Sequence, residues 1–320
     1  MTGPRASSLA IYLAAAAAMA LLPFIAGTYY LGIGLALLSW IALAQSWVLL
    51  SGTTGYISLG HAMFYGLGGY LTVLTWQAWP LWIGLPAAGI AAALAALLLG
   101  WPVLRVRGPY FVILTYGLAE LMKFVVIDIE AKLGKFGRLL MGAPSLETLY
   151  WIMLGLALLA TLATYLVRRS RFGAGLRAIR ENEEAAETLG VPVVRFKLLA
   201  FAASAFIPGI VGGTMALRTA YFEPFQAFNP VTSFTIVVMA MIGGSDDAPG
   251  PILGALLLVV LQELLWVNAP ELYLIILGLV LIGFVLFVPD GLHGRLSRKR
   301  DTSESRARER SRERQEEHPA

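Results

Sequence analysis

Few ionisable side chains stand inside the long apolar stretches of this 320-residue sequence. The central ones are His61, Glu120 with Lys123, and Glu263. A transporter that couples its substrate to ions or protons needs a network of such groups within its membrane-spanning segments. Glu120 and Lys123 are three residues apart and can simply pair along one helix. The sequence therefore gives little support to a self-contained secondary transporter.

Residues for catalytic or metal chemistry are equally scarce. The sequence contains no cysteine, which removes disulfides and thiolate metal ligands. Its histidines, His61, His293 and His318, are scattered without the spacing of metal ligands. No GxxxxGK(S/T) motif occurs, so the chain has no phosphate-binding loop of its own. We expect no enzyme activity, metal or bound cofactor in this chain, and any ATP would be used by partner subunits.

The elements that position these side chains are apolar helices long enough to cross a bilayer. Charged residues make up 14% of the chain, against roughly 25% in soluble domains. A membrane-spanning helix needs about 20 mostly apolar residues. The sequence predicts an all-α, polytopic membrane protein with about ten transmembrane helices. The expected spans are 8–26, 30–50, 57–75, 82–103, 109–128, 148–167, 196–218, 231–245, 251–267 and 271–289.

Two expected spans, 57–75 and 231–245, are unusual because the first is rich in glycine and the second is short. Such segments can be broken helices that line a pathway. They can also be intact helices whose small residues let neighbours pack closely. The sequence leaves both alternatives open.

Lys and Arg are unevenly distributed between the loops on the two sides. One side holds Arg5, Arg105, Arg107, the segment 168–197 and the charged tail, 291–320. The other side holds mainly Lys132, Lys135 and Arg138. Cytoplasmic loops carry the excess of Lys and Arg, so we expect both termini in the cytoplasm.

The two ends of the chain need separate interpretation. Arg5 and the stretch AAAAAMA resemble a signal peptide, but the apolar run continues to Ile25 and into further spans, so we expect an uncleaved first helix. Residues 291–320 are low in complexity and mixed in charge, and cannot bury apolar surface. The tail is either a solvated anchor or a contact for anionic lipid head groups.

A charged segment, RRSRFGAGLRAIRENEEAAETLG at Arg168–Gly190, interrupts the apolar sequence. Most residues of 174–189 favour helix, and Gly190 followed by Pro192 provides a stop. Four apolar side chains fall near one face, which Glu183 interrupts: Leu176, Ile179, Ala186 and Leu189. The segment predicts a short, imperfectly amphipathic cytoplasmic helix, which is either a solvated loop or a contact for a partner.

Within this segment, Glu184-Ala185-Ala186, three further residues and Gly190 form the pattern EAA-xxx-G. The pattern resembles the cytoplasmic helix by which ABC importer permeases bind their ATPase subunits. Two adjacent alanines would let the helix approach a partner closely, and the glycine would turn the chain back towards the bilayer. The resemblance implies that these four residues couple the chain to an ATPase, within a coupling segment of about 168–195.

Four longer blocks resemble the permeases of branched-chain amino acid ABC importers, in particular their M-type subunit. They are GYISLGHAMFYGLGGYL (55–71), RVRGPYFVILTYGLAELMKFV (105–125), FGAGLRAIRENEEAAETLGVPVVRFKLLAFAASAFIPGIVGG (172–213) and PVTSFTIVVMAMIGGSDDAPGPILGALLLVVLQELL (230–265). The resemblance covers roughly residues 30–290. It implies a transmembrane permease domain, 1–290, of the type seen in the vitamin B12 importer, in the plasma (inner) membrane of a prokaryote.

The resemblance also implies a function and partners. The chain would form the translocation path for branched-chain or related amino acids together with a second, homologous permease subunit. Two ATPase subunits would supply ATP hydrolysis, and an extracytoplasmic binding protein would deliver substrate. Membrane lipid would surround the chain, and no nucleic acid is expected.

A weakly polar group of side chains in the third and fifth expected spans is the candidate substrate pathway. Its members are Ser58, His61, Phe64, Thr115 and Glu120. Ser58 and His61 match the SLGHA block of the family. Because the binding protein would provide affinity, a path that holds substrate weakly suits the role. His61 could instead be a buried histidine hydrogen-bonded between helices.

Two departures from the family pattern bear on the substrate more than on the fold. Before the sixth span the family carries a TGGxxGL-like element, where this chain has AKLGKFGRLLMGAPS. After the eighth span the family tends to read GGxGTxxGP, where this chain has GGSDDAPGP with Asp246 and Asp247. Relatives carry urea, short amides and other small acids, which remain alternative substrates.

Overall fold

The computed structural model describes residues 6–135, 137–219, 221–245 and 249–268, with the pairs 275–276, 278–279 and 282–283. Asp246, Asp247, the tail 291–320 and most of the expected span 271–289 lie outside the described residues. The described residues divide into two compact units, one up to Val237 and the other from Val238.

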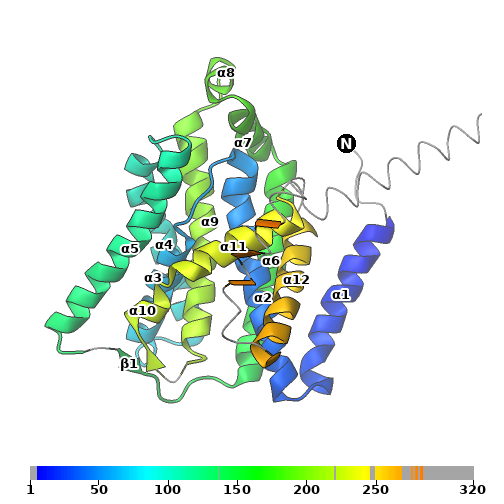
Figure 1. Cartoon of the computed structure of the whole chain (residues 1–320), viewed down its shortest axis with the longest axis vertical. Coiled ribbons are helices and arrows are strands. Elements are labelled where there is room, and N and C mark those ends of the chain that lie inside the picture. The colour runs from blue at the N-terminus through cyan, green and yellow to red at the C-terminus, as the bar shows by residue number, and fades with distance from the viewer. Residues whose placement is uncertain are drawn as a thin grey trace, which may run out of the picture. The chain divides into compact units, whose positions relative to one another are not determined.

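Helices make up nearly all of the described structure (Figure 1). The longer ones are α1 (Ala6–Ile25), α2 (Thr28–Trp47), α4 (Leu81–Val103), α5 (Pro109–Lys132), α6 (Leu146–Arg169), α9 (Val193–Ala216) and α12 (Pro249–Asn268). The shorter ones are the π-helix η1 (Val48–Gly52), α3 (His61–Thr75), α7 (Arg171–Glu181), α8 (Glu183–Thr188), α10 (Pro224–Ala227) and α11 (Pro230–Gly243). Strands β1 (Arg138–Leu139) and β2 (Tyr221–Phe222) pair antiparallel.

Six described helices are long and apolar enough to cross a membrane. They are Thr28–Gly52, Leu81–Val103, Pro109–Lys132, Leu146–Arg169, Val193–Ala216 and Pro224–Gly243. Shorter apolar helices cover Ala14–Ile25 and Pro249–Leu265. The chain is therefore an all-α, multi-pass membrane protein, as the sequence predicts, while the count of ten spans stays a prediction.

In the first unit, α9 packs against both α3 and α4. Glycines allow this approach, since a Cβ atom on Gly68 of α3 would collide with the carbonyl oxygen of Gly209, and one on Gly212 with that of Tyr65. A Cβ on Gly209 would lie 2.8 Å from the Ala88 carbonyl oxygen of α4. Backbone therefore touches backbone along α9, as small residues permit between membrane helices.

The helix of the expected span 57–75 is shorter in the structure than the sequence predicts. This helix, α3, begins only at His61, and residues 55–60 are not helical. From His61 onward the helix is intact and closely packed through its glycines. In the second unit, Gly243 and Gly254 also permit close packing, because Cβ atoms there would collide with the carbonyl oxygens of Gly250 and Met239.

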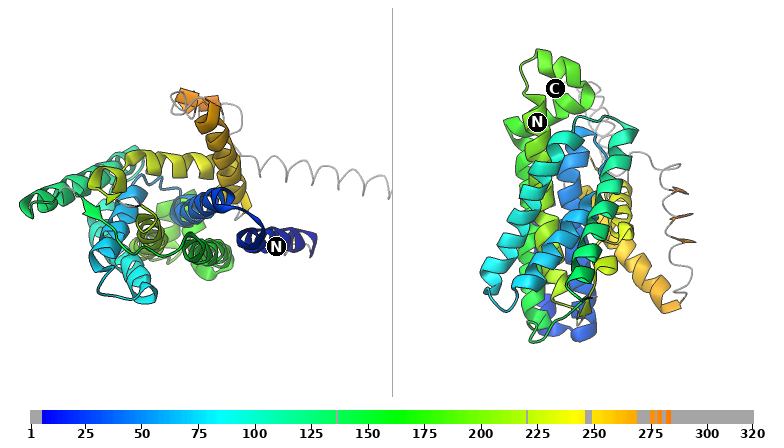
Figure 2. Two further views of the ribbon diagram at one scale, coloured as in Figure 1. Left: turned by 90° about the horizontal axis from the view of Figure 1, so that it is seen from below. Right: turned by 90° about the vertical axis from the view of Figure 1, so that its left-hand side faces the viewer.

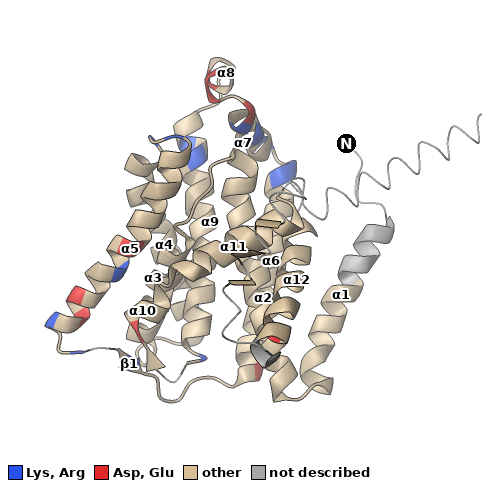
Figure 3. Ribbon diagram, viewed as in Figure 1, with Lys and Arg blue, Asp and Glu red and all other residues tan. Residues whose placement is uncertain are grey.

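Most Lys, Arg, Asp and Glu residues of the first unit lie at the two ends of its helices (Figure 3). Helices α7 and α8 extend beyond the long helices of the first unit at the end opposite β1 (Figures 1 and 2). Between these ends runs α6, whose 24 residues span about 36 Å, enough for a hydrocarbon core of about 30 Å.

Single cysteines at Ala143 and Ala174 are expected to be labelled from opposite sides of the membrane. Both residues are exposed and flank α6, and the chain has no native cysteine to remove. Labelling with an impermeant maleimide in whole cells and in inverted vesicles measures the sidedness. Labelling of both positions from one side would show that α6 does not cross the membrane.

Candidate functional site

The charged segment folds as two helices, α7 and α8, rather than the single helix expected from 174–189. The chain is extended at Asn182, and the Asn182 side-chain oxygen accepts hydrogen bonds from the backbone N–H groups of Glu184 and Ala185, both at 3.0 Å. Asparagine is a favoured N-cap because its oxygen satisfies such otherwise unpaired donors. Asn182 therefore ends α7 and starts α8.

The end of α8 is equally well defined. The Gly190 N–H donates to the Glu187 carbonyl at 2.9 Å, and the Val191 N–H donates to the Ala186 carbonyl at 3.0 Å. This pair of bonds is a Schellman motif, which requires a left-handed residue after the helix. Gly190 provides it with φ +85°. The glycine of the EAA-xxx-G pattern thus has a defined conformational role.

The two alanines of the pattern differ in exposure to solvent. Ala186 is 1% exposed and packs in the same apolar cluster as Leu176 and Ile179 of α7. Ala185 is exposed, whereas the sequence analysis treated both alanines as the contact surface. Ala186 supports α8 from within its own chain. We name the opposite side the outer face of α8: Glu184, Ala185, Glu187, Thr188 and Leu189, all of them exposed.

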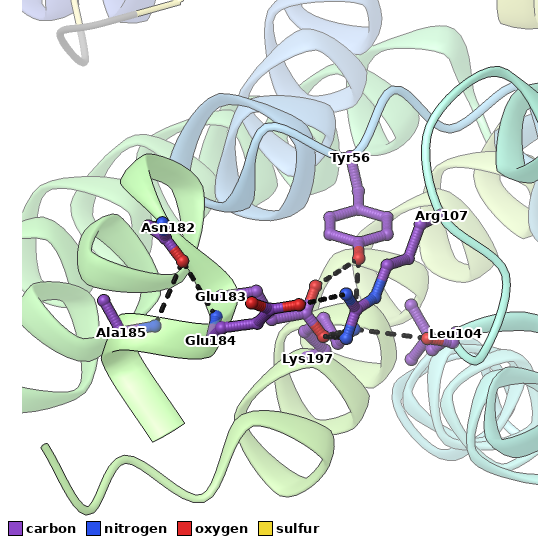
Figure 4. Close-up of polar contacts among 8 residues, drawn as sticks. All are labelled: Tyr56, Leu104, Arg107, Asn182, Glu183, Glu184, Ala185 and Lys197. Atoms are coloured by element: carbon purple, nitrogen blue, oxygen red, sulfur yellow. Dashed lines mark hydrogen bonds and ion pairs between the residues drawn. The ribbon is translucent and has the colours of Figure 1, made fainter. Parts of the chain in front are cut away.

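Beneath α8, three side chains form a closed set of hydrogen bonds that we name the Glu183 cluster (Figure 4). Lys197 of α9 donates to Glu183 Oε1 at 2.8 Å and to the Tyr56 hydroxyl at 3.2 Å. The Tyr56 hydroxyl donates to Glu183 Oε2 at 2.6 Å. Each of the three side chains is therefore bonded to the other two.

Two further residues complete this cluster. Lys197 makes a third hydrogen bond, to the Leu104 carbonyl at the end of α4, at 3.2 Å. Arg107, in the connection to α5, lies 3.4 Å from Glu183 Oε1 and 3.8 Å from a carboxylate oxygen of Glu184. The cluster thus joins α8 to α9, to the end of α4, to the approach to α5 and to the segment before α3.

The environment of the cluster shifts the pKa values of Tyr56 and Glu183. Burial raises the pKa of the Tyr56 hydroxyl well above its usual range, and the hydrogen bond to Glu183 adds to this. Burial alone would raise the pKa of Glu183, but hydrogen bonds from Lys197 and Tyr56 and the nearby cations outweigh it and lower the pKa. At neutral pH the cluster holds a carboxylate, an ammonium and a neutral phenol. The stabilisation that Glu183 contributes is lost as pH falls through its lowered pKa.

The cluster is not predicted from the sequence, although one signal in the sequence points to it. Glu183 interrupts the apolar face of the predicted helix. In the structure Leu176, Ile179 and Ala186 of this face are buried, Leu189 is exposed, and the Glu183 side chain is 16% exposed. A carboxylate on a buried face needs a cationic partner. Lys197, at the start of an apolar span, carries no such signal, because a lysine there normally extends to the membrane surface.

Deeper in the first unit, residues 55–60 bring together several of the candidate pathway residues. Ser58 and Thr115 are fully or almost fully buried, and the Leu59 N–H donates to Thr115 Oγ1 at 3.1 Å. The Gly60 N–H donates to Ser58 Oγ at 3.2 Å, and Trp47 Nε1 donates to the Ser58 carbonyl at 2.9 Å. Side chains thus satisfy the backbone of this irregular segment, as is required within a membrane.

His61 and Phe64, the next candidates, are both fully buried. Neither ring nitrogen of His61 makes a well-formed hydrogen bond within the described residues, although the Ser46 backbone lies close enough to interact with the ring. Phe64 packs edge-on against Phe201 of α9, with ring centroids 5.3 Å apart. Phe64 is therefore part of the core, and His61 is the candidate with unused hydrogen-bonding capacity.

Glu120 lies apart from these residues and forms an ion pair with Lys123 at 2.5 Å on the same helix.

Glu120→Gln alone is expected to reduce the amount of chain in the membrane several-fold, since it leaves Lys123 without its partner in an apolar span. The double variant Glu120→Gln/Lys123→Met should restore the amount to near wild type. Immunoblots of membrane fractions measure this, with Lys132→Met in the exposed Asp128 pair as control. A double variant as depleted as the single one would give Glu120 a further role.

A cavity of about 420 Å³ opens at the end opposite α8, where the sequence departs from the family pattern. It is lined by residues at the end of α3 and around β1, among them Trp76, Gln77, Lys135, Arg138 and Met141. Arg138 donates to Glu130 at 2.8 Å, and the Trp76 ring N–H donates to the Met141 carbonyl at 3.2 Å. This loop therefore has a defined structure of its own.

Comparison with known proteins gives consistent matches. A model for the permease component of the branched-chain amino acid transport system matches residues 29–285. The chain is 30% identical over 275 residues to the high-affinity branched-chain amino acid transport system permease protein LivM of Escherichia coli K12, covering 75% of this chain and 64% of that protein. Its identity to LivH of Salmonella typhimurium is 24% over 282 residues, covering 79% of this chain and 90% of that protein.

Other matches are more distant or shorter. The L-arabinose transport system permease protein AraH of Escherichia coli K12 is 28% identical over 128 residues, 38% of this chain and 39% of that protein. The chain spans just under two thirds of the length of the two LivM proteins, 64% in each comparison. No solved structure shows a significant match.

Proposed function

Because the chain belongs to the family of permease components of branched-chain amino acid transport systems, we propose that it forms the translocation path of an ATP-driven importer. The proposed substrates are branched-chain or related amino acids, the substrates for which LivM and LivH are named. The higher identity to LivM supports the role of an M-type subunit. Urea, short amides and other small acids are the alternative substrates, because the chain departs from the family at two loops.

The observation that carries this proposal is the structure of α8. The helix extends beyond the long helices, is capped at both ends and presents an exposed outer face with Leu189, which is 81% exposed. An exposed leucine on a short, well-anchored helix suits a helix that docks into a groove of a partner. We infer that the partner is an ATPase subunit, since the chain has no phosphate-binding motif.

The remaining partners and the setting belong to the same proposal. A second, homologous permease, two ATPase subunits and an extracytoplasmic binding protein would complete the transporter, of the vitamin B12 importer type and with ten spans. The chain would lie in the plasma (inner) membrane of a prokaryote with both termini in the cytoplasm. It would bind no cofactor, and the ATPase subunits would use ATP.

Uptake measurements test this function. The chain is produced with a homologous permease, two ATPase subunits and a binding protein from the same organism, in a host that lacks branched-chain amino acid uptake. Uptake of labelled leucine, isoleucine or valine is expected, and it should require both this chain and the ATPases. Uptake of urea or acetamide instead would overturn the proposed substrate. Uptake without the ATPases would overturn the proposal of an ATP-driven importer.

A further inference from the structure

In the Glu183 cluster, every hydrogen-bond donor of the buried Lys197 ammonium has an acceptor. Lys197 is 2% exposed, and its three ammonium donors have three acceptors: Glu183, the Tyr56 hydroxyl and the Leu104 carbonyl. Removing one member of such a buried set leaves the others unpaired, which costs more than the interaction itself contributes. The cluster is therefore a tightly coupled set of side chains that joins α8 to α9 and to the segment before α3.

Tyr56 connects this set to the irregular backbone of residues 55–60. Its ring packs edge-on against Phe111 of α5, with centroids 5.2 Å apart, and lies 4.6 Å from the Lys197 ammonium. Ser58 follows two residues later, and His61 begins α3 five residues later. A displacement of the Tyr56 side chain is carried to Ser58 and His61 through a short stretch of backbone.

A second connection ties α7 to the start of this stretch and to the residues just before it. The Arg180 guanidinium donates to the Gly52 carbonyl, at the end of η1, at 2.9 Å. Gly55 has φ +76°, and a Cβ atom there would lie 3.2 Å from Arg180 Cγ. The two cytoplasmic helices therefore hold residues 52–56 at two points.

The backbone between Ser58 and Ala62 is held by single hydrogen bonds with side chains of other elements. Ser51 Oγ accepts from the Ser58 N–H at 3.3 Å, and Ser233 Oγ of α11 accepts from the Ala62 N–H at 2.9 Å. Together with the bonds from Trp47 and to Thr115, these contacts give a segment without a regular ladder of hydrogen bonds. Such a segment can change conformation without unfolding a helix. A π-helix, the adjoining element here, also often marks a functional site.

We propose that the Glu183 cluster is the mechanical link between α8 and the polar interior, so that movement of α8 displaces residues 55–60 and with them Ser58 and His61. Tyr56, Glu183 and Lys197 are then positioning residues for transport, and do not contact the ATPase. This inference rests on the proposed function, since it takes the movement of α8 to come from an ATPase.

Tyr56→Phe tests the link with the smallest change, because it removes the hydroxyl and retains the ring packed on Phe111. The transporter complex is reconstituted into liposomes, and ATPase retention, ATP hydrolysis and substrate uptake are measured separately. ATPase retention should equal that of wild type, while the substrate transported per ATP hydrolysed falls about tenfold, the scale of one lost hydrogen bond to a charged group. Tyr110→Phe at the exposed start of α5 is the matched control and should retain the wild-type ratio.

A second variant keeps the test decisive if the first affects folding. Glu183→Gln should lower the same ratio, and the double variant Tyr56→Phe/Glu183→Gln should be no worse than the more affected single variant, since both break one unit. An unchanged ratio in Tyr56→Phe, or independent effects that multiply in the double variant, would overturn the link. Loss of ATPase retention in Tyr56→Phe would also overturn it, by showing that the cluster merely holds α8 in place. Failure of the wild-type complex to retain an ATPase would instead overturn the proposed function.

Discussion

Replacing Gly212 by valine is expected to remove most of the folded protein from the membrane. A Cβ atom at this position would collide with the Tyr65 carbonyl oxygen of α3, which is backbone and cannot rotate away. Overpacking a fitted contact costs about 1–3 kcal/mol when side chains can adjust. The cost should exceed that range here, because the two helix backbones must separate.

The matched control is Gly155→Val in α6, where a Cβ atom would meet nothing within 4 Å. Both substitutions place the same β-branched residue in a long apolar helix, so they differ in packing alone. Membrane abundance and the thermal stability of the detergent-solubilised protein measure the effect. Equal abundance and equal Tm for the two variants would show that α3 and α9 are not in backbone contact.

The second large effect is expected from Ala185→Arg, which should abolish ATPase retention and uptake while leaving the chain inserted. Ala185 is exposed on the outer face of α8, so the substitution places no charge in the core of its own chain. In a complex it would occupy the contact with the partner, where an unpaired buried charge costs several kcal/mol. We expect retention of the ATPase in detergent pull-downs to fall at least about tenfold, since about 1.4 kcal/mol corresponds to a factor of ten.

Position 185 is preferable to position 186 for this test. Ala186 is buried against α7, so Ala186→Arg would disturb the chain itself and confuse folding with binding. Ala143→Arg is the control for retention, because Ala143 is an exposed alanine at the opposite end of α6. Wild-type ATPase retention and uptake in Ala185→Arg would mean that α8 is only a solvated loop.

Local features of the fold follow closely from the sequence. Apolar runs of sufficient length predict membrane helices, and six described helices meet that criterion. The stop at Gly190 is predictable because a Schellman motif needs a residue with positive φ. Even the break at Asn182 has a local signal, since asparagine followed by two glutamates is a typical helix start.

The site is less predictable because its contacts join residues far apart in the chain. Tyr56 and Glu183 are 127 positions apart, and Tyr56 and Lys197 are 141 positions apart. No local periodicity encodes such pairs, and a single sequence carries no information about covariation. The burial of Ala186 likewise depends on which neighbours the fold supplies, whereas the EAA-xxx-G pattern placed both of its alanines at the partner contact. His61 was found because a histidine inside an apolar span is unusual wherever it packs.

Site-specific crosslinking from α8 tests the central claim, that its outer face contacts the ATPase, most directly. A photo-reactive amino acid is placed at position 185 of this chain in the intact transporter. A control variant of the same chain carries it instead at position 131, an exposed site at the far end of α5. The account predicts a covalent adduct between the chain and the ATPase subunit from position 185 and none from position 131. An intact, transporting complex that gives no ATPase adduct from position 185 would contradict it.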